Sequence, residues 1–140
     1  MKAWNSSAAG VVLALVASLA TAAEPKPGTW ITDGGWGHLT VRAGADGGLE
    51  FELGAMGSNG HACGLEGHIE DGRAALPTDE AQACRISFDA NAQGITVAVH
   101  ADDQEQCRWF CGARAGFEGD YLAVPPGCLP AEVTDRKSVV

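Results

Sequence analysis

Alternation of apolar and polar residues in short segments is the feature of this sequence that most limits its fold. The clearest case is Leu49-Glu-Phe-Glu-Leu53, in which every second residue is apolar. A period of two is typical of a β-strand with one buried face. Turn residues such as Asp46-Gly47 and Asp71-Gly72 separate these segments and suit hairpins. The sequence therefore predicts an all-β domain.

About eight such segments follow one another, with turn signals every eight to twelve residues or so, which is typical of a small antiparallel barrel or sandwich. Residues 101–106 are predicted to form an acidic loop between the last two strands. The final strand is predicted to close the sheet, beside a corner braced by cysteines. The predicted strands cover residues 29–31, 37–43, 49–53, 63–69, 74–76, 84–88, 95–99 and 115–121.

The first 22 residues have the pattern of a secretory signal peptide. Met1-Lys2 is positive, the run from Ala8 to Ala20 is apolar, and Ala20-Thr21-Ala22 is an A-x-A cleavage site. At ~1.5 Å per helical residue the run reaches about 20 Å, short of a bilayer core of about 30 Å. We expect cleavage before Ala23, no membrane span afterwards, and a periplasmic or secreted protein. The predicted parts are a signal peptide (1–22), a lead-in segment (23–27), the β-domain (28–124) and a disordered tail (125–140).

The chain expected after cleavage is strongly acidic. It keeps all 18 acidic residues and loses only Lys2 of the 9 basic ones, so its net charge is −10. Such a charge repels nucleic acid and anionic lipid and favours a basic protein as partner. Solubility alone also explains the charge, and this simpler interpretation stays open.

Five cysteines in an exported chain are expected to form disulfides. With one thiol left free, fifteen arrangements exist. We favour Cys63–Cys84 and Cys107–Cys111, with Cys128 free, and keep Cys84–Cys107 as the second choice for the first bridge. Zinc binding is less favoured, because Cys107 and Cys111 lack a second ligand pair with the usual spacing.

Candidate binding residues are the tryptophans that alternation cannot all place inside, and two acidic residues on one strand face. Trp36 lies in a Gly-Gly-Trp-Gly turn, where it could anchor a partner or cover the open end of a barrel. Serines, cysteines and histidines form no recognisable catalytic motif, so we expect no enzyme, no catalytic residue, no metal and no cofactor. The candidate binding residues are Trp30, Trp36, Trp109, Glu50 and Glu52.

Several segments together resemble a class of small exported bacterial proteins, some of them lysozyme-inhibitor-like. The resemblance rests on Gly-His-x-Cys63-x-Leu-x-Gly67, Cys84-x-Ile-x-Phe, Gly-Ile-x-Val, and Cys107-x₃-Cys111-Gly-x-x-Ala-x-Phe-x-Gly119-x-Tyr121, and covers about Gly28 to Leu122. It implies a small disulfide-bearing antiparallel barrel that inserts a loop into the cleft of a basic hydrolase. The usual Ser-Gly loop with a nearby Tyr is absent, so no inhibitory residue can be carried over.

The sequence thus predicts a binding protein, possible partners being a cationic cell-wall hydrolase or a toxin. Two alternatives stay open. One is a structural or small-ligand-binding envelope protein, and the other, less favoured, is a small hydrolase that uses Glu50 or Glu52 with a histidine.

Overall fold

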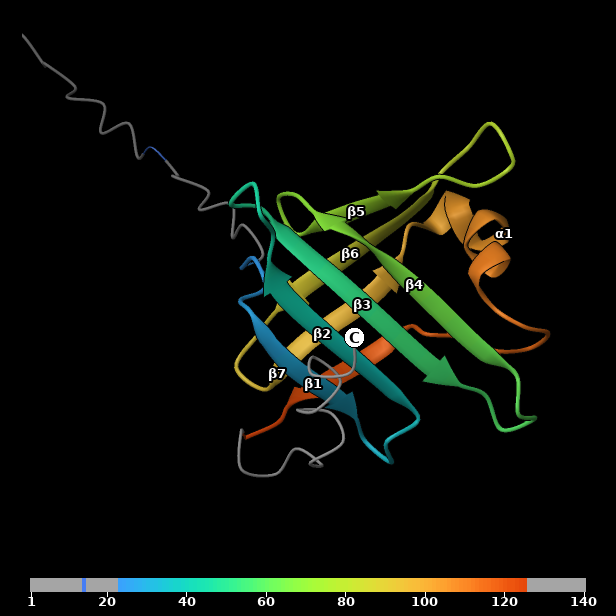
Figure 1. Ribbon diagram of the computed structural model, residues 1–140, viewed down its shortest axis with the longest axis horizontal. Coiled ribbons are helices and arrows are strands. Elements are labelled where there is room, and N and C mark those ends of the chain that lie inside the picture. The colour runs from blue at the N-terminus through green and yellow to red at the C-terminus, as the bar shows by residue number, and fades with distance from the viewer. Residues whose placement is uncertain (1–13, 15–22, 126–140) are drawn as a thin grey trace, which may run out of the picture.

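The protein folds as a nearly closed barrel of eight antiparallel strands (Figure 1). A computed structural model describes residue 14 and residues 23–125. The predicted signal peptide, apart from residue 14, and the predicted tail beyond residue 125, with Cys128, lie outside the described residues. The strands are β1 (Gly28–Thr32), β2 (Gly37–Ala43), β3 (Leu49–Met56), β4 (Ala62–Ile69), β5 (Arg73–Leu76), β6 (Cys84–Ala90), β7 (Gly94–Val99) and β8 (Gly119–Ala123).

The predicted all-β class is confirmed, and of the two predicted architectures, barrel and sandwich, the protein forms the barrel. Gly47 and Gly72 adopt the positive φ values, 82° and 71°, that the two predicted turns require. The turn at Asp46-Gly47 joins a full hairpin of β2 and β3, whereas the turn at Asp71-Gly72 is followed by a single bridge, so the second predicted hairpin does not extend into a ladder. Strand β2 has the bounds predicted for it. The predicted loop at 101–106 is instead helical, because this segment forms short helices up to Phe110: η1 (Ala101–Asp103), α1 (Gln104–Cys107) and η2 (Arg108–Phe110).

Strand order explains how the barrel is assembled. The order β4-β3-β2-β1-β8-β7-β6-β5 places β8 between β1 and β7, so it joins the group β1–β4 to the group β5–β7. The predicted closing strand is therefore present, although it covers Gly119–Ala123 instead of 115–121. Figure 1 shows β2, β3 and β4 in front of β6 and β7, with α1 at the side where β4 and β6 separate.

Inward-facing side chains fill the barrel. Phe51 on β3 packs against Phe88 on β6, with ring centroids 4.8 Å apart, so the core reaches across from one wall to the other. Tyr121 is fully buried and its hydroxyl donates a hydrogen bond of 2.7 Å to the Phe117 carbonyl oxygen. Burial raises the pKa of Tyr121. The interior is therefore a packed core, as expected for a barrel of this size.

The two ends of the barrel differ. At the terminal end, β1 begins at Gly28 and β8 ends at Ala123, and residues 23–25 and 124–125 lie there. At the helical end, the segment 101–111 crosses the boundary between β4 and β5, which we call the seam. Among the described residues β4 and β5 share no ladder, and a single bridge joins Glu70 to Arg73.

Candidate functional site: the stapled turn

Residues 101–111, which we call the stapled turn, are fixed to two strands by two disulfides. Cys107 bonds to Cys84 at the start of β6, and Cys111 bonds to Cys63 on β4. The turn thus spans the seam from one side to the other. The backbone of Cys111 is extended and forms an isolated β-bridge with Cys63. The amide of the next residue, Gly112, donates a 2.8 Å hydrogen bond to the Ala62 carbonyl oxygen.

The favoured cysteine pairing was therefore wrong, although the same four cysteines are bonded. Cys63–Cys84 and Cys107–Cys111 do not form, and the second choice, Cys84–Cys107, does. The physical reason is the strand order: Cys63 lies on β4 at one edge of the sheet, and Cys84 lies on β6, which β5 separates from the seam. They are brought close only to the turn between them, and not to each other by a shared ladder.

A buried carboxylate adds a third attachment. Asp103 is 1% exposed, and its carboxylate accepts hydrogen bonds of 2.7 and 3.0 Å from the Arg85 guanidinium. It also accepts a 3.0 Å bond from the Arg85 backbone amide. Hydrogen bonding by Arg85 holds the pKa of Asp103 below its usual value, and the Asp103 carboxylate in turn raises the pKa of Arg85. Sequence reasoning missed Asp103, which precedes Cys107 by four residues and so shares its helix face.

Trp109 is the most exposed large apolar residue of the described chain, with 60% of its surface in contact with solvent. It lies two residues from each of the bonded cysteines 107 and 111. Both ends of its short 3₁₀ turn are therefore fixed covalently to different strands. An aromatic side chain held in this way loses little conformational freedom when it is buried by a partner.

The other two candidate tryptophans lie elsewhere. Trp36 is 38% exposed and packs edge-on against Tyr121, with ring centroids 6.1 Å apart, so it covers part of the barrel end. Trp30 is half-buried, packs against the core and lines a hollow at the terminal end. The structure therefore does not gather the three tryptophans into one surface.

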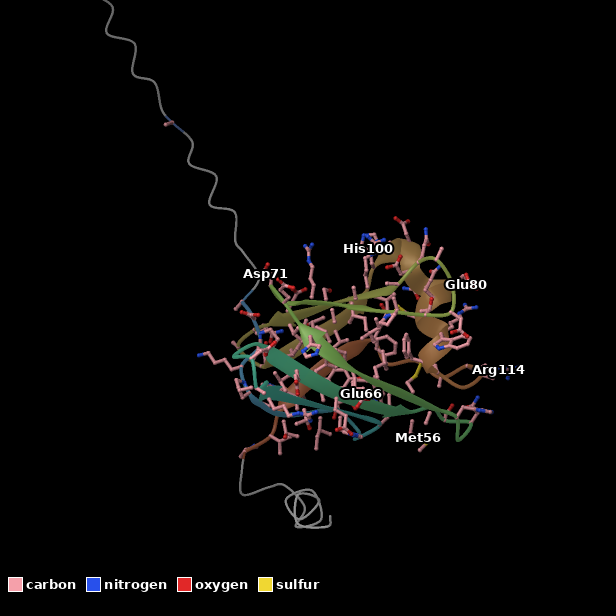
Figure 2. All side chains as sticks on the ribbon, turned by 45° about the horizontal axis from the view of Figure 1, so that its top comes forward. Met56, Glu66, Asp71, Glu80, His100 and Arg114 are labelled. Atoms are coloured by element: carbon pink, nitrogen blue, oxygen red, sulfur yellow. A yellow bond between two sulfur atoms is a disulfide. The ribbon has the colours of Figure 1, made fainter. Side chains whose placement is uncertain are left out.

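Glu50 and Glu52 lie together on the outer face of β3. Arg42 on β2 pairs with both, at 3.2 Å to Glu50 and 3.9 Å to Glu52. Glu52 also lies directly opposite Glu66 on β4, which Figure 2 labels. These carboxylates point outward from a barrel wall, and neither hollow described below includes them. The arrangement is that of solvated surface charge and lacks the cleft that glycoside hydrolysis requires.

Two hollows lie beside the turn between β6 and β7. The first, about 360 Å³, is lined by Trp30, Ala90 and Ile95, with Glu24 and Lys26 among the residues at its edge. The second, about 370 Å³, lies next to Leu122 and Asp120 on β8. Both have the volume of a small-ligand site. Within residues 23–125 no group of three or more histidine, cysteine or acidic side chains is placed to hold a metal ion.

Comparison with known proteins finds no matching family model, no similar curated protein and no similar solved structure. The resemblance to lysozyme-inhibitor-like proteins therefore stays a prediction. In the part of the chain that the structure describes, no helix has the length and apolar character needed to cross a membrane.

Proposed function

We propose that this protein is exported and binds a cationic partner protein through the stapled turn. The observation that carries the proposal is Trp109, a solvent-exposed aromatic residue fixed between two disulfides. Tryptophan is enriched among the residues that dominate binding energy at protein interfaces. Two disulfides also support an oxidising compartment, either the periplasm or the exterior of the cell.

The charge around Trp109 supports a basic partner. The side chains of Asp102 and Glu105 on the same turn are 84% and 82% exposed. Glu105 lies 3.5 Å from the exposed guanidinium of Arg108, and the turn as a whole carries three carboxylates and one arginine. Arg85, by contrast, is engaged by buried Asp103. Residues 23–125 contain 16 acidic and 6 basic residues, so the net charge of this part of the chain favours approach of a basic partner. A cell-wall hydrolase such as a basic lysozyme fits this chemistry and agrees with the resemblance described above.

Binding to a basic lysozyme tests the proposal directly. We expect the disulfide-bonded protein to bind at low salt and to bind more weakly at high salt, because charges of opposite sign are screened. Trp109→Ala removes the anchor and is expected to weaken binding by about 30-fold, the effect of about 2 kcal/mol lost at an interface hot spot. Isothermal titration calorimetry and inhibition of lysozyme activity measure both effects.

Met56→Ala is the matched control. Met56 is 54% exposed, nearly as much as Trp109, and lies at the end of β3, outside the turn. It pairs with Ala62 on β4, next to the Cys63–Cys111 bridge, so it is an exposed apolar side chain near the turn that the turn does not carry. Its truncation is expected to leave binding unchanged within about twofold, as for most surface contacts. Absence of wild-type binding to any basic lysozyme at low salt would overturn the proposed function. Equal losses in the two variants would show that the turn is not the anchor.

A second candidate function is binding of a small ligand at the terminal end. The hollow lined by Trp30 favours it, because a partly exposed aromatic side chain meets polar groups of the β6–β7 turn there. Quenching of Trp30 fluorescence by a library of small apolar and polar compounds, compared with a Trp30→Phe variant, tests this candidate.

A further inference from the structure

The outer face of β1 and β8 carries a strip of side chains without charge. Antiparallel pairing places Ile31 directly opposite Leu122, and the Val124 amide donates to the Thr29 carbonyl oxygen. These four residues, Thr29, Ile31, Leu122 and Val124, form what we call the outer strip. Leu122 is 40% exposed, although it lies in the middle of a strand bordered by ladders on both sides.

A hollow lies directly beside this strip. Leu122 pairs with Gly94 on β7, and both residues line the hollow. The hollow has a volume of about 370 Å³, and Thr96 and Asp120 lie among its polar lining residues. An exposed apolar ridge and a hollow with polar groups therefore lie side by side on one face. An apolar centre with a polar rim is the usual composition of an interface.

We propose that two copies of this chain associate through the outer strip, with Leu122 of each copy placed in the hollow beside Gly94 of the other. A ridge and a hollow on the same face make that face complementary to itself, which is what a two-fold symmetric contact requires. A second copy also suits the charge. Because each copy is strongly acidic, two copies can approach closely only through surfaces that carry little charge.

The association differs from partner binding in its response to salt. In each copy, Asp120 lines the hollow beside Leu122, and its carboxylate accepts a 2.7 Å hydrogen bond from the Thr96 hydroxyl. Two acidic copies repel each other, so added salt strengthens their association. Binding of a basic partner by the stapled turn is weakened by the same salt. Self-association therefore does not depend on the proposed function.

The test is the molar mass of the signal-cleaved, disulfide-bonded protein, measured by sedimentation velocity over a concentration series at low and high salt. We expect the mass to rise toward twice that of the monomer with increasing concentration, and to do so at lower concentration in high salt. Leu122→Asp is expected to shift the midpoint at least 30-fold, because it places a charge in the apolar centre of the contact.

Two further variants keep the test decisive. Leu122→Ser removes the apolar ridge without adding charge, and it covers the case in which the aspartate variant does not fold. Met56→Asp adds the same charge at an exposed position on β3, outside the outer strip, and should leave the midpoint unchanged. A wild-type protein that stays monomeric at all concentrations would overturn the proposal. A mass that is equally reduced by Leu122→Asp and Met56→Asp would also overturn it.

Discussion

In residues 23–125, seven boundaries between neighbouring strands and the single seam are held by different interactions. Each of the seven has an antiparallel ladder, such as the eight residue pairs between β3 and β4. The seam between β4 and β5 has one bridge at its hairpin end and then opens. Beyond that point it is closed by the stapled turn, two disulfides and the Arg85–Asp103 pair.

Side-chain packing also contributes at the seam. Gly67 on β4 leaves room for Leu76 on β5, since a Cβ at that position would be 2.6 Å from the Leu76 Cδ2. Leu76 is buried and belongs to the core. A barrel can therefore close one boundary without a ladder of backbone hydrogen bonds, provided that apolar contact and covalent links replace it. The same links hold Trp109 in place, so closure of the seam and presentation of the candidate site have one structural cause.

Removal of a disulfide is expected to have the largest effect on stability, and it tests whether covalent links close the seam. The bridges join residues separated by 48 and 23 positions. In the loop-entropy model they contribute about 4 and about 3.5 kcal/mol to the free energy of unfolding. We expect Cys63→Ala/Cys111→Ala to lower that free energy slightly more than Cys84→Ala/Cys107→Ala. Urea unfolding without reductant measures both.

Paired substitutions serve as their own control, because they leave no unpaired partner thiol from the removed bridge. A free energy of unfolding equal to that of the wild type in both variants would mean that noncovalent contacts alone close the seam. A large loss in one variant only would show which strand depends on the turn.

The difference between ladders and seam also decides what could be predicted from sequence. A ladder leaves its mark as a period of two, so β2 and the start of β3 were found, and the hairpin at Asp46-Gly47 followed from the turn residues. The inward and outward sides of these strands were also correct: Leu39 and Phe51 are buried, whereas Glu52 is on the outside. Local rules sufficed because each strand and its neighbour are adjacent in sequence.

The seam produces no comparable pattern in the sequence. Its location depends on the insertion of β8 between β1 and β7, a contact between the two ends of the domain. Without the strand order, Cys63 and Cys84 could not be assigned to opposite sides of a gap, and the disulfides were paired wrongly. For the same reason Asp103 could not be distinguished from its exposed neighbour Asp102. Trp109 was proposed as a binding residue only because alternation failed to place it inside.

Two glycines offer a sharper comparison of ladder and seam. At Gly94, within the β7–β8 ladder, a Cβ would overlap the Tyr121 carbonyl oxygen, which is backbone and cannot move without breaking the ladder. At Gly67, next to the seam, it would meet the end of a flexible leucine side chain. We expect Gly94→Ala to cost about 3 kcal/mol and Gly67→Ala about 1 kcal/mol, within the usual range for overpacking.

Thermal unfolding of the two alanine variants measures this difference. Gly64→Ala is the matched control, because no atom lies within 4 Å of a Cβ placed there on the outer side of β4. Similar losses at Gly94 and Gly67 would mean that the seam is packed as rigidly as a ladder. In that case the distinction between the two kinds of boundary would not hold for side-chain packing.

The smallest expected effect is the response of the seam to acid. Asp103 has a lower pKa in the folded protein than its usual value, because Arg85 hydrogen bonds its carboxylate. A carboxyl group of this kind stabilises the fold above about pH 4, the pKa of an unfolded aspartate, and this stabilisation is lost as pH falls through the folded pKa. We therefore expect the free energy of unfolding to fall less steeply below about pH 4 in Asp103→Asn than in the wild type.

Asp102→Asn is the control for this measurement, since the Asp102 side chain is 84% exposed and makes no hydrogen bond to Arg85 among the described contacts. It removes the same charge from the same turn and should keep the acid profile of the wild type. Identical profiles for Asp103→Asn and the wild type would show that the ion pair does not link the stapled turn to β6. The disulfides would then hold Trp109 without its help, and mild acid would leave the candidate site intact. If instead the profiles differ as expected, acid loosens the turn at its buried end, next to Cys107, while both covalent bonds remain.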